Sequence, residues 1–267
     1  MSPVFDIHTH VFPDAIAARV VADLGQRAGL VPSYDGTLAA MLKSMAKAGI
    51  TGALNCPVAT RPEQVESVNR WAIAHHAWPV LSLGSIHPRY PALEAELERI
   101  SQAGLPGIKL HPEYQDFYPD APEMHRIWAT CSKLKLLVLL HAGEDIDFPP
   151  PCHTPPSALR RLIEQYPELR LVLAHFGGWR LWQEVEEVLI GQPVYLDVSF
   201  TAGYLDRDKL VELIRRHGSR RVLFGTDAPW TDQSQELVAF RQLPLTADEQ
   251  SRILWENAAG LLKLPAG

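Results

Sequence analysis

The feature that most constrains the fold is a regular alternation of short apolar runs with longer segments whose apolar residues recur at helical spacing. Most of the short runs are apolar throughout, which is typical of strands buried on both faces of a parallel sheet covered by helices. The pattern therefore predicts parallel strands, each followed by a helix. The expected strands are residues 4–8, 51–56, 80–86, 107–111, 136–141, 170–175, 194–199 and 221–226.

The segments between these runs have the spacing and the end signals of helices. Gly49, Gly104, Gly191 and Gly218 stand where helices should end. Thr246 and Glu249 have the spacing of a capping box, which predicts a final helix over 247–262. Segments 12–34 and 148–156 are expected to be loops that could cover a site. The other expected helices are 38–48, 62–76, 92–103, 123–133, 157–166, 181–189, 207–217 and 235–243.

Repeated strand–helix units with no linker between them predict an α/β fold, a single (β/α)8 (TIM) barrel over residues 1–267. A chain of 267 residues suits this fold, which takes about 250 residues. A doubly wound open sheet is the competing fold, but no glycine-rich phosphate loop follows the first run.

Charge and composition narrow the partners. The net charge of −6 and the lack of a basic run argue against a nucleic-acid binder. No apolar stretch reaches the ~20 residues that span a bilayer, and no signal peptide is visible. The scattered Cys56, Cys131 and Cys152 indicate free thiols in a reducing compartment. We expect a cytoplasmic protein with a small-molecule substrate, and a homo-oligomer stays open.

Titratable residues end several of the expected strands. His8, Lys109, His111, His141, His175 and Asp227 all stand at such ends, where (β/α)8 enzymes build their active sites. A buried imidazole costs free energy unless it is paired, and one metal would satisfy several. His8 and His10 are two residues apart and share a strand face. With His141 and Asp227 they form a set suited to Zn²⁺, with Mn²⁺ or Fe²⁺ possible.

These motifs resemble those of the amidohydrolase superfamily over essentially the whole chain. The resemblance rests on Asp6-Ile7-His8-Thr9-His10, His141, His175 and Gly225-Thr226-Asp227. The amidohydrolase-related branch, which includes hydrolases and metal-dependent decarboxylases, is indicated by the segments 86–89, 107–112 and 253–259. The resemblance implies that His8, His10, His141 and Asp227 are metal ligands. It implies that His175 is an acid/base or substrate contact with one metal, or a ligand with two.

Lys109, His111 and His175 are candidates for a second metal or for the substrate. In binuclear superfamily members a lysine of the fourth strand is carboxylated and bridges two metals, and Lys109 has a comparable place. The alternatives are a lysine that pairs with a buried carboxylate or that binds a substrate carboxylate. We expect a single metal, or two if Lys109 is carboxylated.

The expected activity is hydrolysis of an amide, lactone or related carbonyl bond by a metal-activated water, with Asp227 or His175 moving the proton. The alternative is decarboxylation of an aromatic or unsaturated acid. A barrel that binds metal only for stability is a third reading. Smaller expectations are that Asp6 orients a ligand, Trp230 walls the pocket, Arg89 binds an anion or forms a surface ion pair, and Glu144 and Asp145 are outer acceptors or solvated. Cys152 with His153 falls short of a zinc-site spacing.

Overall fold

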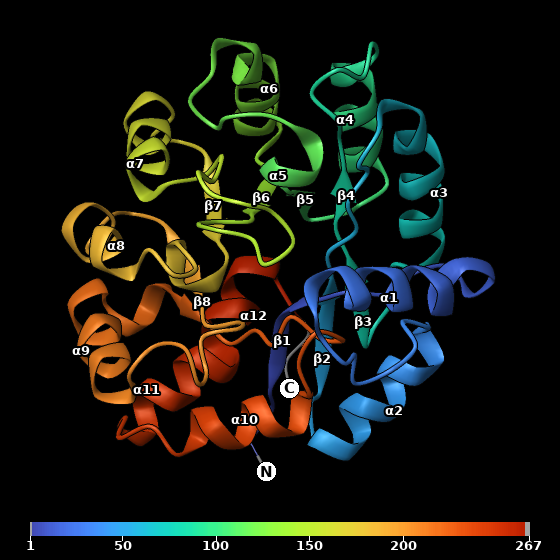
Figure 1. The fold of residues 1–267 in the computed structure, drawn as a ribbon. Coiled ribbons are helices and arrows are strands. Elements are labelled where there is room, and N and C mark those ends of the chain that lie inside the picture. The colour runs from blue at the N-terminus through green and yellow to red at the C-terminus, as the bar shows by residue number, and fades with distance from the viewer. Residues whose placement is uncertain (1, 265–267) are drawn as a thin grey trace.

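The computed structural model describes residues 2–264 and shows a ring of parallel strands surrounded by helices (Figure 1). Two hydrogen-bonded sheets make up the ring, ordered β1-β2-β3 and β4-β5-β6-β7-β8-β9, and all the pairs are parallel. The strands are β1 Phe5–Thr9, β2 Gly52–Asn55, β3 Val80–Ser82, β4 Gly84–Ser85, β5 Gly107–Leu110, β6 Leu137–Leu140, β7 Arg170–Leu173, β8 Tyr195–Asp197 and β9 Val222–Leu223.

The two sheets join into a closed barrel. β3 and β4 are two parts of the expected strand 80–86, interrupted at Leu83, whose N–H donates to the Asn55 carbonyl 2.9 Å away. The last strand meets the first, because the Ile7 N–H donates to the Phe224 carbonyl at 2.9 Å and the Asp227 N–H to the His8 carbonyl at 2.8 Å. The expected (β/α)8 barrel is thereby confirmed.

Helices follow the strands around the outside of the ring (Figure 1). They are α1 Asp14–Ala28, α2 Leu38–Ala48, α3 Val65–His75, α4 Leu93–Gln102, α5 Pro112–Gln115, α6 His125–Leu134, α7 Pro156–Gln165, α8 Trp182–Val188, α9 Arg207–His217, α10 Gln233–Arg241, α11 Ala247–Ser251 and α12 Asn257–Leu262. A π-helical turn, Arg252–Glu256, joins α11 to α12, and the predicted capping box of Thr246 and Glu249 is present. Within residues 2–264, the helices are too short or too polar to cross a bilayer.

One expectation was wrong. Segment 12–34 contains the helix α1 rather than a loop. Its inward face is narrow, since only Ala17, Val21 and Gly25 are buried. A helix that buries few large residues carries a weak apolar period, which is why the pattern did not reveal it.

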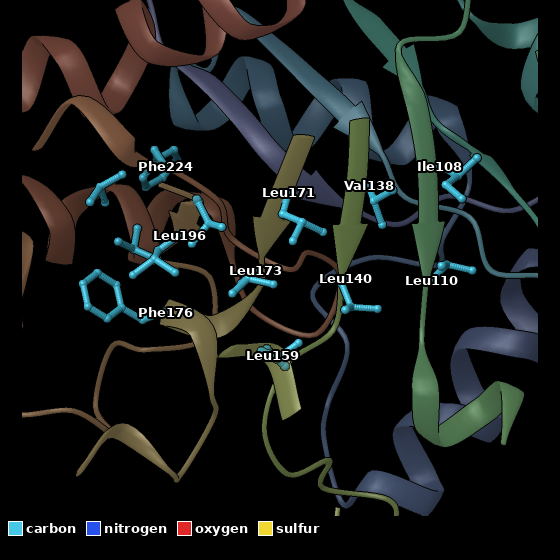
Figure 2. Close-up of a cluster of buried hydrophobic side chains, with 14 of the residues drawn as sticks. Ile108, Leu110, Val138, Leu140, Leu159, Leu171, Leu173, Phe176, Leu196 and Phe224 are labelled. Atoms are coloured by element: carbon cyan, nitrogen blue, oxygen red, sulfur yellow. The ribbon is translucent and has the colours of Figure 1, made fainter. Parts of the chain in front are cut away.

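Alternating residues of the strands build two hydrophobic layers. Leu137 and Leu139 of β6 pack inside the barrel with residues such as Phe5 and Leu223. Val138 and Leu140 point the other way, to the layer between the strands and the surrounding helices (Figure 2). This alternation fixes which strand-end residues face the interior, where the polar residues gather.

Candidate metal centre

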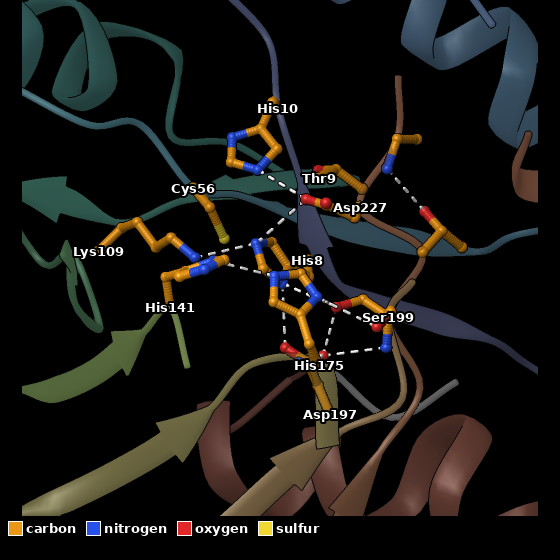
Figure 3. Close-up of polar contacts among 12 residues, drawn as sticks. His8, Thr9, His10, Cys56, Lys109, His141, His175, Asp197, Ser199 and Asp227 are labelled. Carbon is orange, nitrogen blue, oxygen red and sulfur yellow. Dashed lines mark hydrogen bonds and ion pairs between the residues drawn. The ribbon is translucent and has the colours of Figure 1, made fainter. Parts of the chain in front are cut away.

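Three of the four predicted metal ligands meet at the C-terminal end of the barrel (Figure 3). The ligand atoms of His8, His10 and Asp227 lie within 4.8 Å of one another. Asp227 Oδ1 is 3.0 Å from His10 Nε2 and 3.4 Å from His8 Nε2. Tetrahedral ligands ~2.0–2.1 Å from a zinc ion are separated by about 3.3 Å, so the three donors suit such an ion.

A register shift in β1 helps to place His8 at this centre. Phe5 and Ile7 belong to the interior layer, so strict alternation would turn His8 outward. The pairing of β1 with β2 is irregular between Asp6 and Thr9, as at a β-bulge. His8 therefore faces the interior, where it contacts Lys109 of β5 on the far side of the barrel.

Lys109 is fully inside the barrel, at 1% exposure, and its Nζ lies 3.0 Å from His8 Nε2. Burial lowers the pKa of Lys109, while Cys56, Asp227, Asp197 and Asp145 act in the opposite direction. The lysine has no carboxylate within salt-bridge distance among residues 2–264. Of the readings left open for it, the simple lysine–carboxylate pair is therefore not the one that the geometry shows.

Asp197 of β8 was missed from the sequence and supports the centre from below. Its Oδ2 accepts from His8 Nδ1 at 3.0 Å, and its Oδ1 accepts from the N–H groups of His175 and Ser199 at 3.1 and 3.0 Å. The Ser199 hydroxyl also donates to Oδ1 at 2.5 Å. Burial opposes ionisation, but the neighbouring His8 holds the pKa of Asp197 below its usual range.

The contact with Asp197 decides the tautomer of His8. An ionised carboxylate only accepts, so Nδ1 carries the proton and Nε2 presents its lone pair to the centre. Burial and the nearby Lys109 lower the pKa of His8 to about 4, which keeps the ring neutral. A neutral imidazole held by a carboxylate through its other nitrogen is the usual form of a metal-binding histidine.

Two of the centre's residues have strained backbones. Asp227 has φ 65° and His175 has φ 55°, in the left-handed region that costs a non-glycine residue about 1–3 kcal/mol. The hydrogen bonds of their backbone N–H groups, to the His8 carbonyl and to Asp197, help to hold them there. Burial opposes the ionisation of Asp227, but His8 and the hydrogen bond from His10 lower its pKa to about 2.

The fourth predicted ligand, His141, lies in a different set of contacts. Its ring stacks on that of His111, with centroids 4.0 Å apart, and its Nδ1 is 3.1 Å from His175 Nε2. With Asp145, these two stacked histidines form a second group of ligand atoms within 4.8 Å of one another. A role for His141 at the first metal stays a prediction.

The nitrogens of His141 and His175 that face each other raise a question of proton placement. His175 Nδ1 lies 3.1 Å from the Ser199 carbonyl and His141 Nε2 lies 3.1 Å from the Glu144 carbonyl. If both contacts are hydrogen bonds, two lone pairs face each other at 3.1 Å. Burial lowers the pKa of His141 well below its usual value, which disfavours an extra proton. The arrangement therefore calls for a cation or for a different tautomer of His141.

The remaining candidates are placed as follows. Asp6 accepts from the Thr226 hydroxyl at 2.6 Å and from Gln233, so it supports the strand end before Asp227 rather than contacting a ligand side chain. Burial raises its pKa to about 7. Arg89 forms an exposed ion pair with Asp116, and the Trp230 ring lies 6.5 Å from that of His10.

Histidines outside the strand ends have local partners, as expected for structural residues. His217 is buried and contacts the Val194 carbonyl, and His125 contacts the Tyr166 hydroxyl. His75 and His76 contact the carbonyls of Trp71 and Ser82. His153 pairs with Glu113 rather than with Cys152. None of these contacts reaches the centre.

Comparisons with known proteins agree with the fold. A crystal structure of an uncharacterized TIM-barrel protein from Bordetella bronchiseptica is 21% identical, covers 98% of each chain and has a TM-score of 0.81. For 5-carboxyvanillate decarboxylase from Sphingomonas paucimobilis the identity is 17%, the coverage 99% of this chain and 100% of that one, and the TM-score 0.70. A dihydroxybenzoic acid decarboxylase from Polaromonas, solved with bound manganese, has 18% identity, coverage of 100% and 98%, and a TM-score of 0.73.

Sequence comparisons identify the family. No curated protein matches the chain. A sequence model described as Amidohydrolase matches residues 5–264, which include every strand of the barrel and each predicted site residue. This chain therefore belongs to the amidohydrolase family, as its strand-end motifs indicated.

Proposed function

We propose that the protein is a metal-dependent hydrolase that cleaves an amide, lactone or related carbonyl bond of a small molecule. The observation that carries the proposal is the convergence of the ligand atoms of His8, His10 and Asp227. Two neutral imidazole nitrogens and one carboxylate are ligands for Zn²⁺ or Mn²⁺. A divalent ion in such a site supplies Lewis acidity to a carbonyl oxygen and lowers the pKa of water toward about 7.

The protein's own groups then divide the remaining tasks. Asp227 is ionised, and its side chain is 13% exposed, so it can accept a proton from the attacking water. His8, at 1% exposure, lies deeper and holds its place through Asp197. Substrate therefore approaches from the side of His10 and Asp227, and His175 is the second group placed to return a proton to the leaving group.

Decarboxylation is the second candidate, supported by two observations. Two of the similar solved structures are named as decarboxylases of aromatic acids. In this chain the Phe200 ring lies 6.4 Å from that of His175 and 5.9 Å from that of Trp179, which gives the mouth an aromatic wall for a flat substrate. His175 would then supply the proton that replaces carbon dioxide.

One assay separates the two activities. Protein loaded with Zn²⁺ or Mn²⁺ is incubated with lactones, amides and aromatic acids while acid release and carbon dioxide are measured together. The proposal expects acid release without carbon dioxide, and loss of that signal in Asp227→Asn. Carbon dioxide release that Asp227→Asn abolishes would establish the second candidate instead. Turnover that Asp227→Asn leaves intact would contradict both.

A further inference from the structure

We propose that His111, His141 and Asp145 form a second binding site for a divalent cation, outside the centre of His8, His10 and Asp227. The three ligand atoms lie within 4.8 Å of one another. Asp145 Oδ2 is 3.2 Å from His111 Nε2 and 3.9 Å from His141 Nε2. These separations bracket the spacing of about 3.3 Å expected between ligands of a tetrahedral ion. We call this group the outer site.

The carboxylate of the outer site is held in a ligand-like orientation. The Asp147 N–H donates to Asp145 Oδ1 at 2.8 Å, which leaves Oδ2 to face the two imidazoles. Asp147 is fixed in turn, because the Tyr114 hydroxyl donates to its Oδ2 at 3.0 Å. Tyr114 also packs edge-on against the His111 ring, with centroids 4.6 Å apart. Such supporting contacts are what orients the ligands of known metal sites.

A cation at the outer site also resolves the proton placement of His141. With Nε2 bound to the ion, the ring carries its proton on Nδ1, which then donates to His175 Nε2 at 3.1 Å. The Glu144 carbonyl, 3.1 Å from Nε2, lies on the same side and adds an oxygen donor. Two lone pairs no longer face each other, and His175 keeps its contact with Ser199.

The competing position for a second ion lies between His141 Nδ1 and His175 Nε2. Those two nitrogens have Lys109 nearby but no carboxylate within ion-pair distance among the described residues, so an ion there would need a carboxylated Lys109. The outer site already contains an anionic ligand, Asp145, which offsets the repulsion from Lys109. That difference in charge favours the outer site.

Metal stoichiometry distinguishes the positions. Folded protein is dialysed to equilibrium against increasing Mn²⁺ and its metal content is measured, and Mn²⁺ is located by anomalous diffraction from crystals. Wild type should bind a second equivalent beyond the first. Asp145→Asn and His111→Asn should lose the second equivalent only, whereas Asp227→Asn should keep it. Glu144→Gln is the matched control, because its side chain points to Arg180, 3.9 Å away, and it should retain both equivalents.

Three results would overturn the outer site. Wild type could saturate at a single equivalent, or Asp145→Asn and His111→Asn could both keep the second one. Alternatively, the second equivalent could be lost in Lys109→Met and His175→Asn but kept in Asp145→Asn, which would place it between His141 and His175. The readout is independent of turnover, so an inactive substrate panel would contradict the proposed function and leave this test intact.

Discussion

Replacing Asp197 by asparagine tests whether this carboxylate prepares His8 for metal binding. In the native protein Oδ1 takes three donors and Oδ2 takes the His8 Nδ1 proton. An asparagine has one acceptor oxygen, which the three donors at the Oδ1 position will claim. Its NH₂ group then faces His8 Nδ1 as a donor. The proton of His8 must move to Nε2, where it blocks the lone pair directed at the centre.

The expected loss follows from the loss of this single supporting contact. Removing such a partner typically weakens metal binding about 10- to 100-fold, which corresponds to about 1.4–2.7 kcal/mol. The assay is competition for Zn²⁺ between the folded protein and a chromophoric chelator, with melting temperature as a check on folding. Turnover at saturating metal should recover more than turnover at limiting metal, because the chemistry of Asp227 is unchanged.

Ser199→Ala is the matched control. It removes a hydroxyl 3.1 Å from His8 Nδ1 but leaves the carboxylate that sets the tautomer. Its metal affinity should fall by less than that of Asp197→Asn. An Asp197→Asn protein that folds and binds zinc with wild-type affinity would refute the reasoning, and equal losses in both variants would point to general damage to packing.

Three further predictions concern single residues. His10→Ala should lose the metal of the inner centre, measured by elemental analysis, and equal metal content in both proteins would remove His10 from that site. His175→Asn should keep this metal while turnover falls by about 10²–10⁴, and full activity would make His175 a structural residue. Burial raises the pKa of Glu236 from 4.5 to about 8, so the folded state keeps a proton that the unfolded state releases between these values. Stability should therefore fall as pH rises from 4.5 to 8, and chemical denaturation of Glu236→Gln should show a flatter dependence, whereas identical slopes would contradict the assignment.

The barrel and most of its site could be predicted because two signals are local. Continuous apolar runs identified the buried strands, and the residues that follow them had to meet at one end of the barrel. His8, His10 and Asp227 were found in this way and do converge. The capping box of Thr246 and Glu249 was equally local, since its two partners are three residues apart.

Other features depend on contacts that no local pattern records. Asp197 lies within a strand, and only its alternation with Leu196 and Val198, which face outward, marked it as an interior acid. The separation of His141 from His8 depends on ring orientation and on the stacking with His111. The helix α1 escaped because its buried face is small.

The seam of the barrel has a consequence for how the protein is made. The inner centre joins His10 to Asp227, which are 217 residues apart in the sequence, across the same strands whose pairing closes the ring. During synthesis the first ligands emerge long before the last one, so a complete inner set exists only when almost the whole chain has left the ribosome. A metal bound there would tie the first strand to the last and stabilise only the closed ring. Loading the inner centre is therefore coupled to completion of the fold.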